Sequence, residues 1–248
     1  ARDSFVLVGN GNKNAPEVLR VLNPVTPLDN QTSLNAARTL AQRFGSDRGV
    51  VIELLNEPWP PTGRSQGWLL WRDGGVLNNP NSEFNGKRFT GVNAGIKAVR
   101  DAGAKNVVIV QGIGASFAEF PGGIVDPLKQ VAYAVHPFFA DGGPESLNWD
   151  TRFGTFAQTH PFILTAWGAH TKEPWCAKAG IETPQKFINY LKARNIGLVG
   201  YAFDVPWSMV RDFRISPGVA MKLGTACPPL PGSIPLGSAG ELMQRHFT

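Results

Sequence analysis

The sequence contains few charges, few cysteines and no long apolar run. Charged residues make up 17% of its 248 positions. No apolar stretch approaches the roughly 20 residues of a membrane-spanning helix, so we expect no membrane span. No signal peptide is visible at Ala1, so a targeting segment was either never present or has been removed. The two cysteines, Cys176 and Cys227, either form a disulfide, as in an exported protein, or are free thiols, and the sequence does not decide between these alternatives.

Clusters of basic residues and metal-binding patterns are also lacking. The net charge is +5, from 24 basic and 19 acidic residues, but no segment is rich in Lys or Arg. A solvated surface explains this charge, so we expect no nucleic-acid partner. No group of His, Cys and Asp has the spacing of a metal site, and the Gly-rich loops lack a phosphate-binding pattern. We therefore predict neither a metal nor another cofactor.

The chain does contain enough apolar sequence for one sizeable core. Hydrophobic residues make up 42% of it, and there are 28 Gly, 20 Pro and 7 Trp. We expect residues 1–248 to form a single domain, with residues 228–248 as an extended C-terminal tail. Many aromatic and few charged residues are typical of a compact core, and also of a secreted protein whose rings stack on sugars.

Helical and strand patterns alternate along the chain from residue 34. Apolar residues recur at helical spacing in 34–44, 87–102, 150–158 and 184–194, and short apolar strands are expected at 50–55, 107–110, 131–135, 162–165 and 197–203. This alternation is typical of a parallel α/β fold with right-handed crossovers. Residues 58–85, rich in Trp, Pro, Gly and Asn, are predicted to form a long loop.

The fold that we predict is α/β, a (β/α)8 TIM-type barrel. Such a barrel needs about eight strands, whereas five are clear and the first 33 residues offer at most two more, at 5–8 and 18–22. Three explanations are open. The barrel is incomplete at its N-terminus, an N-terminal piece lies outside this sequence, or the pattern at the start is misidentified.

The motif Asn56-Glu57-Pro58 follows the first clear strand and gives the strongest indication of function. The residues before it are apolar apart from Glu53, as in a buried parallel strand. In a (β/α) barrel, chemistry takes place at the C-terminal ends of the strands. Glycoside hydrolysis requires two carboxylates at such a site. An ordinary strand-to-loop turn is the alternative for this motif alone, and the position expected for the second carboxylate holds Ala166.

Two later strand ends complete a pattern of three motifs. These are residues 52–58 (Ile-Glu-Leu-Leu-Asn-Glu-Pro), 133–137 (Tyr-Ala-Val-His-Pro) and 161–168 (Pro-Phe-Ile-Leu-Thr-Ala-Trp-Gly). In this order and at barrel spacing, they resemble glycoside hydrolase family 5, the cellulase-like barrels, over roughly residues 34–215. The resemblance implies a retaining, endoglucanase-like O-glycoside hydrolase that acts on β-linked oligo- or polysaccharide. It also implies a secreted or periplasmic monomer.

The resemblance assigns roles to individual residues. Glu57 matches the family's acid/base, Asn56 the amide that binds the sugar 2-hydroxyl, and His136 the histidine of a His-x-Tyr motif. Trp59 and Trp167 are candidate residues for stacking on a sugar ring. The family's arginine and histidine from early strands have no clear match.

Three positions depart from the family pattern. Ala166 occupies the nucleophile position, Phe138 the tyrosine position, and Phe203 the position of a tryptophan that floors a sugar subsite. Alanine cannot attack a sugar, so the covalent route of hydrolysis is lost. A tyrosine hydroxyl would lose its partner together with the carboxylate, so Phe138 is consistent with Ala166. Glu173 and Asp204 are the alternatives for the missing carboxylate. Roles as ordinary loop groups are favoured for both.

These departures leave open whether the protein is an enzyme. Phe138 and Phe203 favour a naturally altered site over an engineered Glu-to-Ala change, which would explain Ala166 alone. The first hypothesis is a member of the hydrolase lineage in which Glu57 survives as acid/base. The second is a catalytically inactive glycan-binding or scaffold protein on the same fold, and the third is a structural protein without a cleft.

Overall fold

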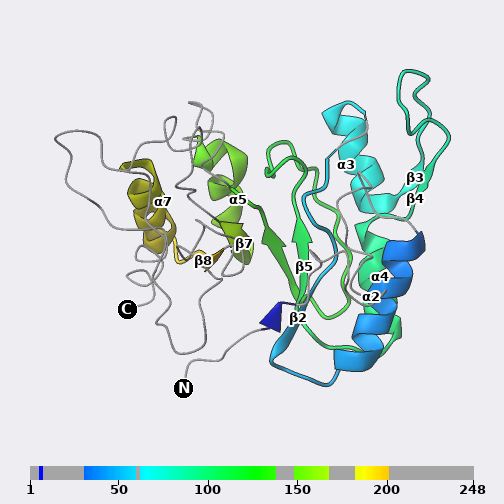
Figure 1. Cartoon of the computed structure of the whole chain (residues 1–248), viewed down its shortest axis with the longest axis horizontal. Helices are drawn as coiled ribbons and strands as arrows, with labels where there is room; N and C mark the ends of the chain where they lie inside the picture. The colour runs from blue at the N-terminus through cyan, green and yellow to red at the C-terminus, as the bar shows by residue number, and fades with distance from the viewer. Residues whose placement is uncertain (1–5, 8–30, 60–61, 138–147, 168–181, 201–248) are drawn as a thin grey trace, which may run out of the picture. The chain divides into compact units, whose positions relative to one another are not determined.

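The computed structural model describes residues 6–7, 31–59, 62–137, 148–167 and 182–200 (Figure 1). The chain divides into two compact units, Ala1–Ala134 and Val135–Thr248, and each is described by itself. Some of the features singled out from the sequence lie outside the described residues and stay predictions. They are Phe138, Glu173, Cys176, Phe203, Asp204, Cys227 and the segments 18–22 and 228–248.

The first unit contains a parallel sheet. Its strands are β1 (Val6–Leu7), β2 (Val50–Glu53), β5 (Val108–Gln111) and β6 (Val131–Ala134), which lie side by side in that order. Ile52 is in register with Val108, and Gln111 with Ala134. Every residue of β5 is buried, as expected for a strand covered on both faces. The strands predicted at 50–55, 107–110 and 131–135 are confirmed.

Three helices and a short hairpin complete the first unit. They are α2 (Gln31–Phe44), α3 (Arg64–Asp73), β3 (Gly75–Val76), β4 (Arg88–Phe89) and α4 (Val92–Asp101). Helices α2 and α4 pack against each other and lie along one side of β2 and β5 (Figure 1). Helix α4 buries Val92, Ile96 and Val99, whose spacing places them on one face. The helices predicted at 34–44 and 87–102 are confirmed, although the second starts later because β4 occupies its first residues.

The prediction of a long loop at 58–85 was wrong, because this segment contains α3 and the strand β3. Trp68 and Trp71 of α3 are 0% and 1% exposed. Their rings pack on Phe117 and Phe120, with centroids 5.9 Å apart for Trp68 and Phe117 and 5.5 Å apart for Trp71 and Phe120. Burial of these large rings stabilises the helix, whereas the Trp- and Gly-rich composition gave no sign of it.

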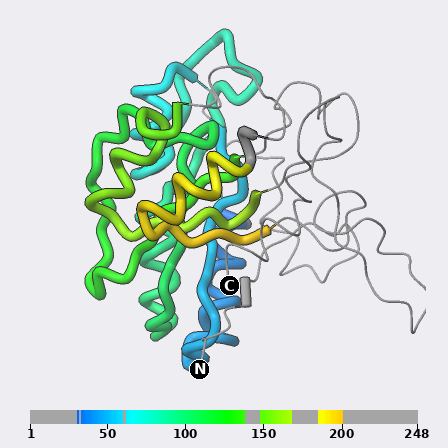
Figure 2. The backbone as a smooth tube through the Cα atoms, turned by 90° about the vertical axis from the view of Figure 1, so that its left-hand side faces the viewer, coloured from blue at the N-terminus to red at the C-terminus, as the bar shows by residue number. Residues whose placement is uncertain are grey.

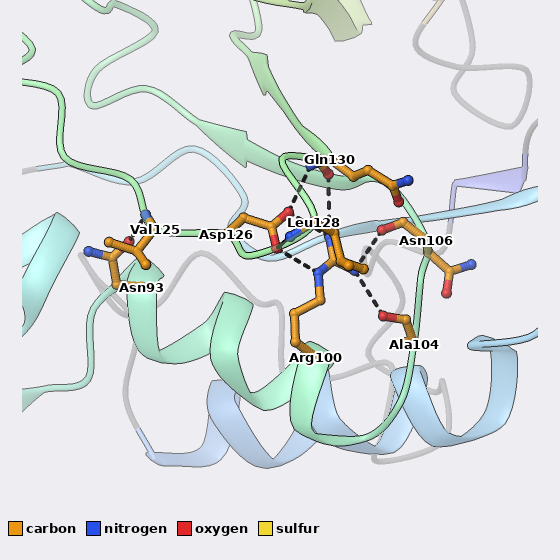
Figure 3. A network of polar contacts seen from close by, with 8 residues as sticks. All are labelled: Asn93, Arg100, Ala104, Asn106, Val125, Asp126, Leu128 and Gln130. Carbon is orange, nitrogen blue, oxygen red and sulfur yellow. Dashed lines mark hydrogen bonds and ion pairs between the residues drawn. The ribbon is translucent and has the colours of Figure 1, made fainter.

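A buried ion pair fastens the segment between β5 and β6 to α4 (Figure 3). The Arg100 guanidinium donates to both carboxylate oxygens of Asp126, at 2.8 and 2.9 Å, and these side chains are only 7% and 3% exposed. The remaining Arg100 donors reach the main-chain oxygens of Ala104, Asn106 and Gln130. Because Arg100 donates to it, the pKa of the Asp126 carboxyl is lowered to about 2. All the groups of this network serve the fold.

The second unit contains a parallel strand pair and a helix. Strands β7 (Phe162–Trp167) and β8 (Gly197–Gly200) pair, and α7 (Glu182–Ala193) runs back beside β8 (Figure 2). A π-helical turn, η3 (Asp150–Gly154), continues into the short α5 (Thr155–Ala157). The strand predicted at 162–165 and the helical segments predicted at 150–158 and 184–194 are confirmed. For the strand predicted at 197–203, the described part is β8.

Side chains from η3 and α7 form the core of this unit. Phe153, Phe187 and Leu191 are at most 2% exposed. The Tyr190 hydroxyl donates to Asp150 Oδ1 at 2.7 Å, and burial raises the pKa of this tyrosine. Among the helices that the structure describes in either unit, none is both long and apolar enough to cross a membrane.

Candidate functional site

Glu57 is presented to solvent at the C-terminal end of β2. The strand's hydrogen bonding continues past its last residue, because the Leu54 N–H donates to the Ile109 carbonyl at 3.0 Å. Leu54 and Leu55 are buried, Asn56 is half-buried and Glu57 is exposed. Pro58 is buried again, and its carbonyl accepts the Gly114 N–H at 2.9 Å. Buried residues therefore hold the chain on both sides of the exposed carboxylate.

The backbone at Glu57 has an unusual conformation. Its φ angle is +49°, in the left-handed region that residues other than glycine seldom adopt. Such a conformation costs on the order of 1–3 kcal/mol and persists only where its surroundings impose it. The Glu57 N–H donates to the side-chain oxygen of Gln111 at 2.8 Å, so a neighbouring strand holds it in place.

Gln111, the last residue of β5, connects Glu57 to the carboxylate of Glu53. Its side chain is 1% exposed. The Gln111 amide nitrogen donates to Glu53 Oε1 at 2.7 Å, while its amide oxygen accepts the Glu57 N–H. Its main-chain carbonyl accepts the Trp71 indole N–H at 3.0 Å. The buried amide therefore links the end of β2 to the turn that displays Glu57.

Sequence reasoning assigned no role to Gln111. The available signal was its position, since a polar residue ends an otherwise apolar and fully buried strand. The next residue, Gly112, has its own constraint. A Cβ there would collide with the Ser116 carbonyl, so only glycine allows the chain to turn back immediately after Gln111.

His136 and Ala166 lie in the second unit. Ala166 is near the C-terminal end of β7, and His136 lies beside this strand. The His136 ring Nε2 and the Thr165 hydroxyl are 2.8 Å apart. Ala166 is buried, with 5% of its surface exposed. Between the pairs Leu164–Leu198 and Trp167–Gly200, β7 contains one residue more than β8. Thr165 and Ala166 therefore occupy a β-bulge, a feature that is frequent beside active sites because it redirects side chains.

The two predicted stacking residues lie in different surroundings. Trp59 is 40% exposed, and its ring contacts Phe84 with the centroids 5.4 Å apart. Trp167 is fully buried. Phe138 and Phe203 lie outside the described residues, so the geometry that would relate them to Ala166 stays a prediction. Within the ranges that the structure describes, no three His, Cys, Asp or Glu side chains are grouped as metal ligands.

Comparisons with known proteins agree with the motifs. The profile described as Cellulase (glycosyl hydrolase family 5) matches residues 22–205. Among curated proteins, no match was found.

Several solved structures resemble the chain at low sequence identity. A triple mutant of the endo-beta-1,4-glucanase from Xanthomonas axonopodis pv. citri is 16% identical, with a TM-score of 0.52, and the match covers 98% of this chain and 72% of that one. A beta-glucanase from Saccharophagus degradans is 18% identical, with a TM-score of 0.53 and coverage of 75% and 55%. A hyperthermostable endocellulase is 16% identical, with a TM-score of 0.55 and coverage of 84% and 65%.

At such identities, the similarity shows the fold alone. It confirms the predicted (β/α)8-type barrel. The described residues supply six parallel strands, β1, β2, β5, β6, β7 and β8, of the roughly eight that a closed barrel contains. The position of Glu57 at the C-terminal end of β2 is thus at the face where barrel enzymes carry their active sites.

Proposed function

Because the chain belongs to glycosyl hydrolase family 5, we propose that it binds β-linked glucans, with Glu57 as the acid/base and Ala166 in the position of the nucleophile. The observation that carries this proposal is the display of Glu57. Glu57 is exposed at the end of a barrel strand, and the hydrogen bond that its N–H donates to the Gln111 side-chain oxygen holds its backbone in a strained conformation. Strain of this kind is concentrated at functional sites.

Other residues of the three motifs, and the candidate stacking residues, also have a place in this proposal. Glu57 donates its proton to the glycosidic oxygen, and the Asn56 amide binds the hydroxyl at carbon 2 of the sugar. The ring Nε2 of His136 lies 2.8 Å from the Thr165 hydroxyl, and one residue separates His136 from Phe138 in the sequence. Trp59 offers an exposed ring for a sugar face, and Trp167 and Phe203 are assigned to the substrate site by family resemblance alone.

Ala166 determines what this site can do chemically. A retaining mechanism needs a second carboxylate roughly 5–5.5 Å from the first to form the glycosyl-enzyme. The methyl group of Ala166, buried in the bulge of β7, can neither attack nor stabilise positive charge. We therefore expect negligible hydrolysis of β-glucans by the chain as it stands.

A second function follows from the same observation. Without the nucleophile, the protein would serve as a glycan-binding or scaffold protein on the barrel, since stacking on Trp59 requires no carboxylate. In either case we propose a secreted or periplasmic monomer, formed as a single barrel domain, whose partner is a β-linked oligo- or polysaccharide.

The test restores the missing carboxylate. We expect Ala166→Glu to give weak turnover of an aryl β-cellobioside and to lower the free energy of unfolding by about 1–3 kcal/mol, because the new carboxylate is buried without a hydroxyl partner. Burial also raises its pKa and leaves less of the ionised nucleophile. Adding Phe138→Tyr should raise kcat about tenfold, the equivalent of one hydrogen bond to a charged group.

Two controls accompany this experiment. Ala166→Gln has the same size as Ala166→Glu but no charge, so it should give no turnover. Glu57→Gln added to Ala166→Glu should abolish most of the restored activity. Full activity from Ala166→Glu alone would show that the rest of the site is intact and would contradict natural alteration. Absence of turnover in all variants, including the one with Phe138→Tyr, would contradict the assignment of position 166.

A further inference from the structure

The hairpin β3–β4 carries a well-defined loop that projects from the first unit. In both views the loop stands clear of α3 and α4 (Figures 1 and 2). Its base is closed by hydrogen bonds from the Leu77 N–H to the Lys87 carbonyl at 3.0 Å and from the Gly86 N–H to the Leu77 carbonyl at 2.8 Å. The Leu77 side chain is fully buried, so the loop is anchored in the core.

Polar side chains hold the loop in one conformation. The Asn79 N–H donates to the Asn85 side-chain oxygen at 2.8 Å, and the Asn81 N–H donates to the Asn79 side-chain oxygen at 3.1 Å. The Phe84 N–H donates to the Ser82 hydroxyl at 3.2 Å. These local bonds replace the backbone ladder that the loop lacks. Phe84 is thereby presented from a preorganised turn.

Phe84 meets Trp59, which belongs to a distant part of the first unit's sequence. The two rings are inclined at 72°, with their centroids 5.4 Å apart. The Lys87 ammonium lies 4.9 Å from the centre of the Phe84 ring. Trp59 is still 40% exposed, and Phe84 is half-buried. Since Trp59 follows Glu57 by two residues, the Cα atoms of these residues lie within about 7 Å of each other.

We propose that Trp59 and Phe84 form a sugar-binding subsite beside Glu57, which takes one pyranose ring of a β-linked glucan. This inference rests on the proposed function of Glu57. A pyranose presents an apolar face of C–H groups and a rim of hydroxyls, so it is suited to an exposed aromatic face with polar groups around it. The Lys87 ammonium, which lies over the Phe84 ring, supplies three N–H donors for the sugar hydroxyls.

The composition of the surface favours a sugar over a protein partner. In the described part of the chain, the exposed large apolar residues are Trp59, Leu69, Val107, Val125 and Leu128, and Trp59 alone among them is aromatic. A stable protein interface buries about 800 Å² on each partner. A single ring pair between asparagines and a lysine provides much less apolar surface, but enough for one sugar ring.

Calorimetric titration with cellotetraose tests this subsite in the chain as it stands. We expect Trp59→Ala to weaken binding about tenfold and Phe84→Ala about two- to tenfold, in line with the contribution of aromatic pairs. Phe84→Leu keeps an apolar side chain at the tip of the loop but removes the ring, so it should weaken binding to a similar degree while leaving the thermal unfolding temperature unchanged. Leu69→Ala, at a residue of α3 that is 50% exposed, is the matched control and should bind normally.

The outcomes separate this inference from the proposed function. If Trp59→Ala or both Phe84 variants bind cellotetraose as tightly as the unaltered chain, the subsite is overturned while glucan binding stands. If the unaltered chain binds neither cellotetraose nor mannotetraose, the proposed function fails and the subsite fails with it. Reduced affinity in Trp59→Ala and both Phe84 variants, with Leu69→Ala unaffected, supports the subsite.

Discussion

Gln111 illustrates how one buried residue determines the geometry of the candidate site. Its amide donates to Glu53 and accepts from the Glu57 N–H, at 2.7 and 2.8 Å. We expect Gln111→Leu to lower the free energy of unfolding by about 3 kcal/mol, because it leaves the part-buried Glu57 N–H and Glu53 carboxylate without this partner. Urea unfolding measures the loss. Gln130→Leu, the same change at an exposed side chain, should alter stability little.

A rescue experiment separates the hydrogen bonds from simple packing. Gln111→Glu alone places a second carboxylate against Glu53 and should also destabilise the protein at neutral pH. Combining it with Glu53→Gln restores a donor on one side and an acceptor on the other, so the double variant should regain most of the lost stability. If Gln111→Leu cost less than about 1 kcal/mol, or if the double variant gained nothing, these bonds would not be what holds Glu57.

At the scale of residues, the sequence predicted the exposed acid but not its support. Asn56-Glu57-Pro58 at a strand end was enough to expect a carboxylate at the active face of a barrel. The role of Gln111 depends on the positive φ of Glu57 and on the alignment of β2 with β5, and neither is visible in a single sequence. Trp68 and Trp71 lie in a segment that the sequence predicted to be a loop, but both are core residues.

At the scale of elements, the Arg100–Asp126 pair makes the loop before β6 sensitive to acid. The pKa of Asp126 falls to about 2 in the folded protein, against about 3.9 in an unfolded chain. The pair therefore contributes stability that is fully present above about pH 4 and is lost as the pH falls through 2, and its size is on the order of 2 kcal/mol. Asp126→Asn also leaves Arg100 buried without its counter-charge, so we expect a loss of about 3–5 kcal/mol at pH 7.

Urea unfolding at pH 7 and pH 2.5 checks this prediction. The difference between Asp126→Asn and the unaltered protein should shrink at the lower pH, where the aspartate of the unfolded chain is already protonated and that of the native protein starts to be. Asp101→Asn is the control, since its ion pair with Lys97 is exposed at 59% and 73% and should contribute less than about 1 kcal/mol. A loss at Asp126 that is as small as that at Asp101, or independent of pH, would contradict a buried pair.

Elements with strong periodicity were predictable from the sequence, and those stabilised by distant contacts were not. Strands β2, β5 and β6 are apolar apart from Glu53 and Gln111 at the ends of the first two, and α2 and α4 have apolar residues at helical spacing, so their pattern alone identifies them. Helix α3 is held by the burial of tryptophans against residues about 50 positions later in the chain. The hairpin β3–β4 consists of two-residue strands, too short for an alternating pattern.

At the scale of the whole molecule, family membership and the barrel fold are established, and the proposed chemistry assigns roles to two strand ends. Glu57 follows β2, and Ala166 lies in β7. If they are acid/base and vacated nucleophile position, a small anion should fit the space that the missing carboxylate would fill. The assignment of position 166 stays a prediction from the sequence, and the bulge around Ala166 was not predictable, because a bulge depends on the pairing of β7 with β8.

The most direct measurement is the anomeric configuration of the product formed from an aryl β-cellobioside in the presence of azide. Azide in the place of the nucleophile attacks the sugar from the face opposite the leaving group, so we predict an α-glycosyl azide, identified by NMR, and negligible turnover without azide. Glu57→Gln should slow this reaction most for substrates with poor leaving groups, which need the acid. A β-glycosyl azide, ordinary hydrolysis without azide, or no reaction in either condition would contradict the roles assigned to Glu57 and position 166.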